Sequence, residues 1–165
     1  MKLQKLYSYV RRAMDDYSMV DDGDKIAVGV SGGKDSLALL YALSGLRKFY
    51  PKKFDIVALT VNLGFENQDF NLIKDFCKNL DVECKIIDTE IGDIVFHKRK
   101  ESNPCSLCAK MRKGSLNDVA KKMGCNKVAY THHRDDMIET MLMSLIYEGR
   151  FHCFNPVTYL DRMGL

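Results

Sequence analysis

The fold is decided by residues 25–50, which read KIAVGVSGGKDSLALLYALSGLRKFY. Residues 25–30 form an apolar run typical of a buried strand, and a helix is expected from about residue 35 to residue 50, where Pro51 ends it. The hexapeptide SGGKDS lies between the two. Glycines let the backbone approach an anion closely, and a helix start offers unpaired N–H groups and the positive end of its dipole. The segment therefore predicts a phosphate-binding turn between a strand and a helix.

The alternation of strands and helices continues along the chain. Further strands are predicted at residues 54–61, 82–87 and 127–131. Further helices are predicted at residues 2–19, 69–80, 105–123 and 134–147, and residues 91–104 are expected to be irregular. Strands joined by helices of this length form a parallel sheet with right-handed crossovers. We expect an α/β, doubly wound, Rossmann-like sheet with a leading amphipathic helix and with its ligand beyond the carboxyl ends of the strands.

Composition indicates one ordinary globular domain. The 165 residues are 46% hydrophobic and 28% charged, which argues against a disordered or low-complexity chain. Charges interrupt the N-terminal segment, and no apolar run reaches the length of a membrane span, so a cytoplasmic protein without a membrane partner is expected. Residues 157–160 look like a strand followed by a turn. We therefore expect residues 1–165 to form one domain that stops before its last strands.

Basic residues are concentrated in one part of the chain. Residues 95–134 carry ten Lys or Arg and two acids, a net charge of +8, whereas the other 125 residues carry 15 basic and 20 acidic side chains, a net charge of −5. A solvated helix face would explain such a run. A surface that contacts a polyanion would explain it as well.

The glycine loop does not match two common phosphate motifs. A Walker A loop would need glycine at position 28 and Ser or Thr at position 35, where the chain has Val28 and Asp35, and no G-x-G-x-x-G can be written over these glycines. The loop instead resembles the PP-loop of the N-type ATP pyrophosphatases. That resemblance implies that the loop grips the β- and γ-phosphates of ATP, which is cut between its α- and β-phosphates. The nucleotide-binding residues that it implies are Val30, Ser31, Gly32, Gly33, Lys34, Asp35 and Ser36, with adenine near Val61 and Asn62 and with Asp35 also catalytic.

A second motif follows the predicted strand at 127–131. Residues 131–140, THHRDDMIET, are similar to the G-H-H-x-D-D-x-x-E-T box of tRNA-modifying members of that superfamily, with Thr131 in place of the usual glycine. His133 and Arg134 could meet phosphate charge, and Asp135 or Asp136 could hold Mg²⁺. His133 and Asp136 are therefore candidate nucleotide-binding residues. A core or capping role for the paired histidines is the alternative.

A pair of cysteines opens the basic helix. Asn103 suits the N-cap and Pro104 the first helical position, which places Cys105 and Cys108 one turn apart on one face. A helix start favours thiolates, which serve metal binding or sulfur chemistry. A lone C-x-x-C could be a redox pair, half of a zinc site or part of an iron–sulfur site. Cys77 and Cys84, in contrast, fall on apolar stripes and are predicted to be packing residues.

The three motifs together resemble the tRNA-cytidine 2-sulfurtransferase family over nearly the whole chain. The resemblance implies ATP-dependent tRNA thiolation, in which a cytidine C2 carbonyl is adenylated and its oxygen replaced by sulfur. It also implies Mg²⁺, a sulfur donor (a cysteine desulfurase or sulfide) and a [4Fe–4S] cluster on three cysteines. Cys105 and Cys108 correspond to the first two ligands, and the third would lie downstream of residue 165. Both cysteines are thus candidate metal-binding and catalytic residues. The sequence is compatible with a homodimer but does not establish one.

Two other functions are compatible with parts of the pattern. A tRNA-isoleucine lysidine synthetase would also adenylate a cytidine but would attack it with lysine and would not need Cys105 and Cys108. A regulatory nucleotide-binding module would carry a structural zinc on the same two cysteines and two further ligands, and would perform no chemistry.

Overall fold

The chain folds around a four-stranded parallel sheet. A computed structural model describes residues 3–65, 68–99 and 103–165. The strands are β1 (Asp24–Gly29), β2 (Phe54–Asn62), β3 (Glu83–Asp88) and β4 (Lys127–Ala129), in the order β3-β2-β1-β4, and all three pairings are parallel. The predicted α/β class and its parallel sheet are confirmed. Because the chain passes from β1 to β2 on one side and reaches β4 on the other, the strand order reverses next to β1, and this is where such sheets bind their ligands.

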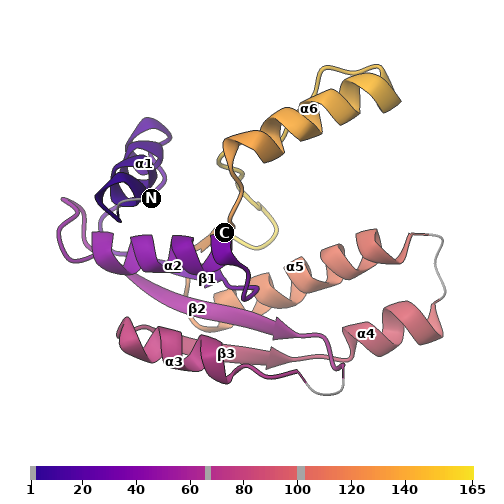
Figure 1. Ribbon diagram of the computed structural model, residues 1–165, viewed down its shortest axis with the longest axis horizontal. Helices are drawn as coiled ribbons and strands as arrows, with labels where there is room; N and C mark the ends of the chain where they lie inside the picture. Colours follow the sequence, from indigo (N-terminus) through magenta and orange to yellow (C-terminus); the bar gives the residue numbers. More distant parts are fainter. Residues whose placement is uncertain (1–2, 66–67, 100–102) are drawn as a thin grey trace.

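Helices cover both faces of the sheet (Figure 1). On one face, α1 (Leu3–Asp16), α2 (Lys34–Leu46) and α3 (Asn71–Asn79) enclose a core with residues such as Val28, Leu40 and Ile73. On the other face, α5 (Pro104–Lys122) packs Leu116 and Ala120 against Val57 and Leu59. The near-continuous apolar run of β2 follows from this arrangement, since both of its faces are covered.

Two segments differ from the predictions. Residues 91–98, expected to be irregular, form a short helical turn α4 (Ile91–Asp93) that continues into the π-helical segment η1 (Ile94–Lys98). The apolar residues Ile91 and Val95 are both buried, which is the packing reason for this helical path. Residues 157–160, expected to be a strand, have no strand partner in the described chain, and Val157 and Tyr159 are exposed.

The last helix, α6 (Arg134–Glu148), projects away from the sheet (Figure 1). It ends at Gly149, whose φ of +62° is the left-handed conformation typical of a residue that closes a helix. The segment after it folds back, because the Cys153 thiol donates to the carbonyl of Met137 at 3.3 Å and the ring of Phe154 lies 4.9 Å from that of His132. None of the helices in the described ranges is long and apolar enough to cross a bilayer.

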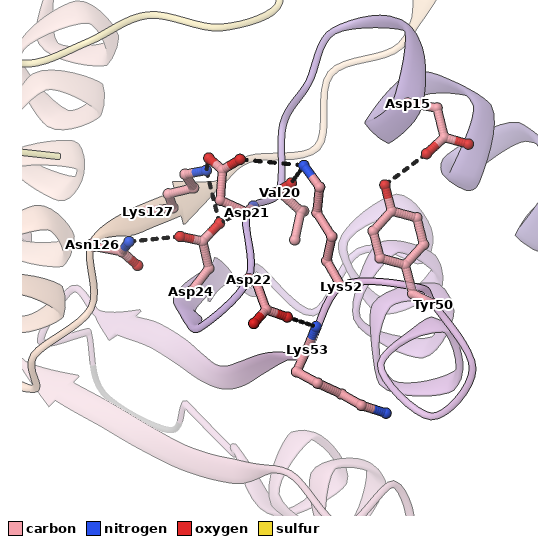
Figure 2. A network of polar contacts seen from close by, with 10 residues as sticks. All are labelled: Asp15, Val20, Asp21, Asp22, Asp24, Tyr50, Lys52, Lys53, Asn126 and Lys127. Atoms are coloured by element: carbon pink, nitrogen blue, oxygen red, sulfur yellow. Dashed lines mark hydrogen bonds and ion pairs between the residues drawn. The ribbon is translucent and has the colours of Figure 1, made fainter.

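A polar network fixes the amino-terminal edge of the sheet (Figure 2). The buried carboxylate of Asp24 accepts from the backbone N–H of Asp21 at 2.6 Å, from the amide of Asn126 at 2.7 Å, and lies 2.7 Å from Nζ of Lys127. Lys127 also pairs with Asp21, which pairs with Lys52 in turn. The network therefore ties the starts of β1, β2 and β4 together at the edge opposite the predicted ligand site.

Candidate functional site

The glycine loop presents an uncapped helix N-terminus. Gly32 has a φ of +85°, a left-handed conformation that glycine adopts without strain, and Gly33 is the N-cap of α2 with no side chain to bond the first N–H groups. Ser36 braces the turn: its hydroxyl donates to the carbonyl of Gly33 at 2.9 Å and accepts from the backbone N–H of Ser31 at 3.2 Å. Because the first N–H groups of α2 are left to an incoming ligand, the turn suits an anion.

A cavity of about 510 Å³ opens directly beside this turn. Its size lies within the range of small-molecule sites. One wall is the glycine loop and the ends of β1 and β2, one is the middle of α5, and one is the segment after β4. The cavity therefore lies where the strand order reverses. Its lining residues are Gly29, Val30, Ser31, Gly33, Asp35, Ser36, Leu59, Val61, Ala109, Arg112, Lys113, Leu116, Tyr130, Thr131 and His132.

The residues predicted from the sequence to bind the nucleotide make up only part of the cavity lining. Of the proposed nucleotide-binding residues, Val30, Ser31, Gly33, Asp35, Ser36 and Val61 line the cavity, whereas Gly32, Lys34, Asn62, His133 and Asp136 are outside its lining. Lys34 is exposed and pairs with Asp35 at 3.0 Å. Asn62 is used by the protein itself, since its amide donates to Asp88 at 2.9 Å and its oxygen accepts from the backbone of Gly64.

Arg112 and Lys113 bring positive charge into the cavity wall. Both belong to the basic segment 95–134, which the sequence analysis did not connect with the glycine loop. Helical spacing could have made this connection, because residues three and four apart share one face of a helix. On α5 that face carries Cys105, Cys108, Ala109, Arg112 and Leu116. The cavity wall and the cysteine pair thus follow one another along the same helix face.

Tyr130 anchors the wall beneath Lys113. Its hydroxyl donates to the buried side chain of Asn117 at 2.8 Å, its ring lies 5.6 Å from Nζ of Lys113, and burial raises its pKa to about 12. Gly29 allows this packing, because a Cβ there would meet Leu116 at 3.2 Å and the Tyr130 ring at 3.3 Å. Tyr130 is therefore a neutral, fixed part of the site. The hydroxyl of Thr131, next along the chain, is buried without a hydrogen-bond partner among the described residues.

The histidine and aspartate of the second motif cap α6. The Asp136 carboxylate accepts from the backbone N–H of His133 at 2.7 Å, and Nδ1 of His133 accepts from the backbone N–H of Asp136 at 3.4 Å. This reciprocal pair satisfies two N–H groups at the helix start. His132, which sequence reasoning did not single out, lines the cavity instead.

Cys105 and Cys108 lie one turn apart at the start of α5, as predicted. Asn103 caps this helix by accepting from the backbone N–H of Ser106 at 3.1 Å, with Pro104 at the first helical position. Both thiols are free, Cys105 exposed and Cys108 half-buried. Within the described ranges, no third Cys, His, Asp or Glu is grouped with them in a way that could hold a metal ion. Among the described residues, the set that could hold the predicted cluster is therefore limited to these two cysteines.

The two other predicted thiols are packing residues. Cys77 is fully buried in the core between α3 and the sheet, and Cys84 packs against that core. Burial, with the neighbouring Cys84, raises the pKa of Cys77 to about 12, so this thiol stays protonated at neutral pH. The prediction that the pair serves packing is confirmed.

The basic segment is divided between two edges of the molecule. Lys110, Arg112 and Lys113 are exposed on the cavity half of α5, whereas Lys127 belongs to the network of Asp21 and Asp24 at the opposite edge. Lys98 is exposed and pairs with Asp93 at 2.7 Å. Only part of the basic segment 95–134 therefore contributes to the positive surface near the cavity, and Lys127 does not.

Curated relatives share most of this chain. It is 38% identical over 162 residues to a tRNA-cytidine(32) 2-sulfurtransferase of Geobacter sulfurreducens, with 98% of this chain and 63% of the relative covered. It is 40% identical over 164 residues to a protein of the same name from Aliivibrio fischeri, with 95% and 53% covered. The chain thus spans between about half and two thirds of the length of these relatives.

Solved structures agree on the fold. A U34-tRNA thiolase, NcsA of Methanococcus maripaludis with its [4Fe–4S] cluster, superposes with a TM-score of 0.74 at 29% identity, covering 89% of this chain and 50% of that one. The NH3-dependent NAD synthetase of Campylobacter jejuni has the same fold at 19% identity, with a TM-score of 0.56 over 97% of this chain and 69% of that one.

The family model of the PP-loop domain matches residues 3–153, which include the glycine loop, the cysteine helix and the box at the start of α6. The resemblance that these motifs carry is confirmed over nine tenths of the sequence, and the chain belongs to the PP-loop domain family.

Proposed function

We propose that this chain is the nucleotide-binding part of a tRNA sulfurtransferase, which converts ATP to AMP and pyrophosphate and places sulfur on a cytidine. One observation carries the proposal: a single cavity has the glycine loop on one wall and, on another, the helix that begins with Cys105 and Cys108. The activating nucleotide and the thiols that handle sulfur would thus meet at the same edge of the sheet. The names of the relatives support tRNA as the substrate.

ATP fits the cavity by charge and by shape. The N–H groups at the start of α2 and the hydroxyls of Ser31 and Ser36 would bind the β- and γ-phosphates, with Lys34 as an additional charge from the rim. Arg112 and Lys113 would face the α-phosphate from α5. The apolar side chains of Val30, Leu59 and Val61 would receive the adenine, with Asn62 at the end of the same strand.

Magnesium would accompany the nucleotide. Mg²⁺ in such sites keeps several waters and needs one or two carboxylates in addition to phosphate oxygens. Asp35 supplies a carboxylate in the cavity wall, and we propose it as the catalytic residue that positions the metal-bound triphosphate. Asp136, engaged as the cap of α6, is the less suitable ligand.

The chemistry begins by activating a poor leaving group. The C2 oxygen of cytidine attacks the α-phosphorus, the bond between that phosphorus and the bridging oxygen breaks, and pyrophosphate leaves with the electron pair. Hydrosulfide then attacks C2, the C2–O bond breaks, and AMP leaves while the proton of the sulfur passes to solvent. No electrons are exchanged with an external oxidant or reductant. Cys105 and Cys108 would orient the hydrosulfide through their thiols, without forming a covalent bond to it. Cys105 and Cys108 would also serve as two ligands of the [4Fe–4S] cluster that the family resemblance implies.

The test separates the proposed function from the two alternatives. The chain is incubated with unmodified tRNA, ATP, Mg²⁺ and sulfide, and the digested nucleosides are analysed by mass spectrometry. A cytidine heavier by the replacement of oxygen with sulfur, formed only with ATP, is expected, and Cys105→Ser should abolish it. With lysine in place of sulfide, the appearance of a lysine adduct would establish the lysidine alternative. Binding of ATP with no turnover, together with stoichiometric zinc, would establish the regulatory module.

A further inference from the structure

Two phenylalanines form an exposed aromatic pair that the proposed nucleotide site does not use. Phe65 follows β2 and Phe96 lies in η1, and their ring centroids are 5.9 Å apart with the rings tilted by 46°. The two residues are 43% and 44% exposed. Single exposed apolar residues are common, but two aromatic rings that contact each other and remain open to solvent are an interaction surface to be explained.

The backbone around Phe65 holds its ring in place. Gly64 has a φ of +83°, and a Cβ there would lie 2.6 Å from the carbonyl oxygen of Thr89. Gly92 lies beneath the ring itself, since a Cβ there would lie 2.7 Å from the Phe65 ring. The N–H of Gly92 donates to the carbonyl of Leu63 at 2.8 Å. The loop after β2 thus approaches α4 closely, and the Phe65 ring lies against the backbone of Gly92.

The pair stands at the same edge of the sheet as the cavity. Val61 lines the cavity and Phe65 follows it by four residues, at the carboxyl end of β2. The other ring belongs to η1, which packs against α5, the helix of the cysteine pair. His97, Lys98 and Arg99 follow Phe96 along the chain and are exposed, and Lys98 pairs with the exposed Asp93 at 2.7 Å. An exposed aromatic pair followed directly by three basic residues suits single-stranded nucleic acid, because bases stack on rings while cations meet phosphates.

We propose that Phe65 and Phe96 form a stacking platform for an unpaired base of the RNA substrate, next to the site where the target cytidine is modified. This inference rests on the proposed function and adds the residues that hold the RNA single strand. A flat π surface takes any base, so the platform would select loops over duplexes rather than one sequence over another.

The test compares two RNA probes with two variants. The probes are a hairpin with a single-stranded loop and a blunt duplex of equal charge. The double variant Phe65→Leu/Phe96→Leu keeps the apolar volume but removes both π surfaces. The matched control is Phe49→Leu, because Phe49 is also exposed and contacts an aromatic ring, that of Tyr7 at 5.9 Å, but follows α2 at the opposite edge. ATP binding by each variant reports that the fold is intact.

We expect the double variant to bind the hairpin at least about 5-fold more weakly than the wild type, as for the loss of one stacked base, and to bind the duplex unchanged. The slope of affinity against salt should stay the same, since no phosphate contact is removed. Equal hairpin affinity of the double variant and the wild type, or an equal loss on the duplex, would overturn the platform and leave the proposed function standing. A wild-type chain that binds neither probe would overturn both.

Discussion

At the scale of single residues, Gly32 and Gly33 play different parts in the same loop. Gly32 has a φ of +85°, whereas Gly33 has a φ of −73°, which any residue can adopt, and a Cβ on Gly33 would make only an ordinary contact with Ser31 at 3.5 Å. Gly32→Ala should therefore lower the free energy of unfolding by about 1–2 kcal/mol and weaken ATP binding. Gly33→Ala is the matched control and should leave stability unchanged. Urea denaturation and calorimetric titration with ATP measure both effects, and equal destabilisation by the two variants would contradict the assignment.

Single cysteines divide into those that pack and those that react. Cys77→Ser should lower the free energy of unfolding by about 1–3 kcal/mol, because it places a hydroxyl in a fully buried apolar site. Cys105→Ser should change stability by less than about 0.5 kcal/mol, since that side chain is exposed, and should abolish thiolation while sparing ATP binding. Thiol titration in the native state should label Cys105 rapidly and Cys77 only on unfolding. A Cys105→Ser protein with full thiolation would contradict this division.

At the scale of elements, local patterns predicted most of the fold. The apolar runs and their glycine or proline ends located all four strands and the helices α1, α2, α3, α5 and α6 to within a few residues. The pattern failed at 91–98, where Ile91 and Val95 are the buried apolar side chains and the helical turns depend on packing against α5. It failed again at 157–160, where apolar residues remain exposed. Likewise, the glycine loop is a short local motif that the sequence alone reveals. Tyr130 and Leu116 join the site only through tertiary packing, which local sequence patterns do not show.

The exposed face of α5 is where the proposed RNA surface can be tested. Arg112 and Lys113 line the cavity, so their variants would mix ATP and RNA effects, and Lys110 is the suitable position. Lys110→Ala should weaken binding of any RNA and reduce the slope of log affinity against log salt by about 1. Lys74→Ala is the control, because Lys74 is equally exposed but lies on α3 at the other face of the sheet. Identical salt slopes for the two variants would show that α5 does not contact phosphates.

At the scale of the whole molecule, the network of Asp21, Asp24 and Lys127 joins three strand starts. Burial raises the pKa of Asp24, but hydrogen bonds from the Asp21 backbone, Lys127 and Asn126 hold it below its usual range. Hydrogen bonds from Lys127 and Lys52 lower the pKa of Asp21. Because the pKa of each aspartate is lower in the folded state, both carboxylates stabilise the fold above pH 4. This stabilisation is lost as the pH falls and the carboxylates become protonated. The pKa of Lys127 is raised, because its two aspartates outweigh burial, so its contribution is lost only as the pH rises above about 10.

Lys127→Met should therefore lower the free energy of unfolding at pH 7 by about 1–3 kcal/mol, because the Asp24 carboxylate stays buried without its cation. The difference from the wild type should shrink as the pH falls below 4, when the aspartates become protonated. Lys53→Met is the control, since the Lys53 side chain is exposed. Lys53 contacts Asp22 through its backbone N–H, which the substitution keeps. Denaturant titrations across pH measure the effect. A deficit for Lys127→Met that persists unchanged at pH 2 would contradict the electrostatic origin of the network.

The central claim is that the cavity beside the glycine loop activates a tRNA base with ATP. The most direct measurement is the fate of ATP labelled at its γ-phosphate, incubated with the chain, Mg²⁺ and unmodified tRNA but no sulfur source. The account predicts labelled pyrophosphate that appears only with tRNA and is lost in Asp35→Ala. Labelled orthophosphate in its place, or pyrophosphate released at the same rate without RNA, would contradict it.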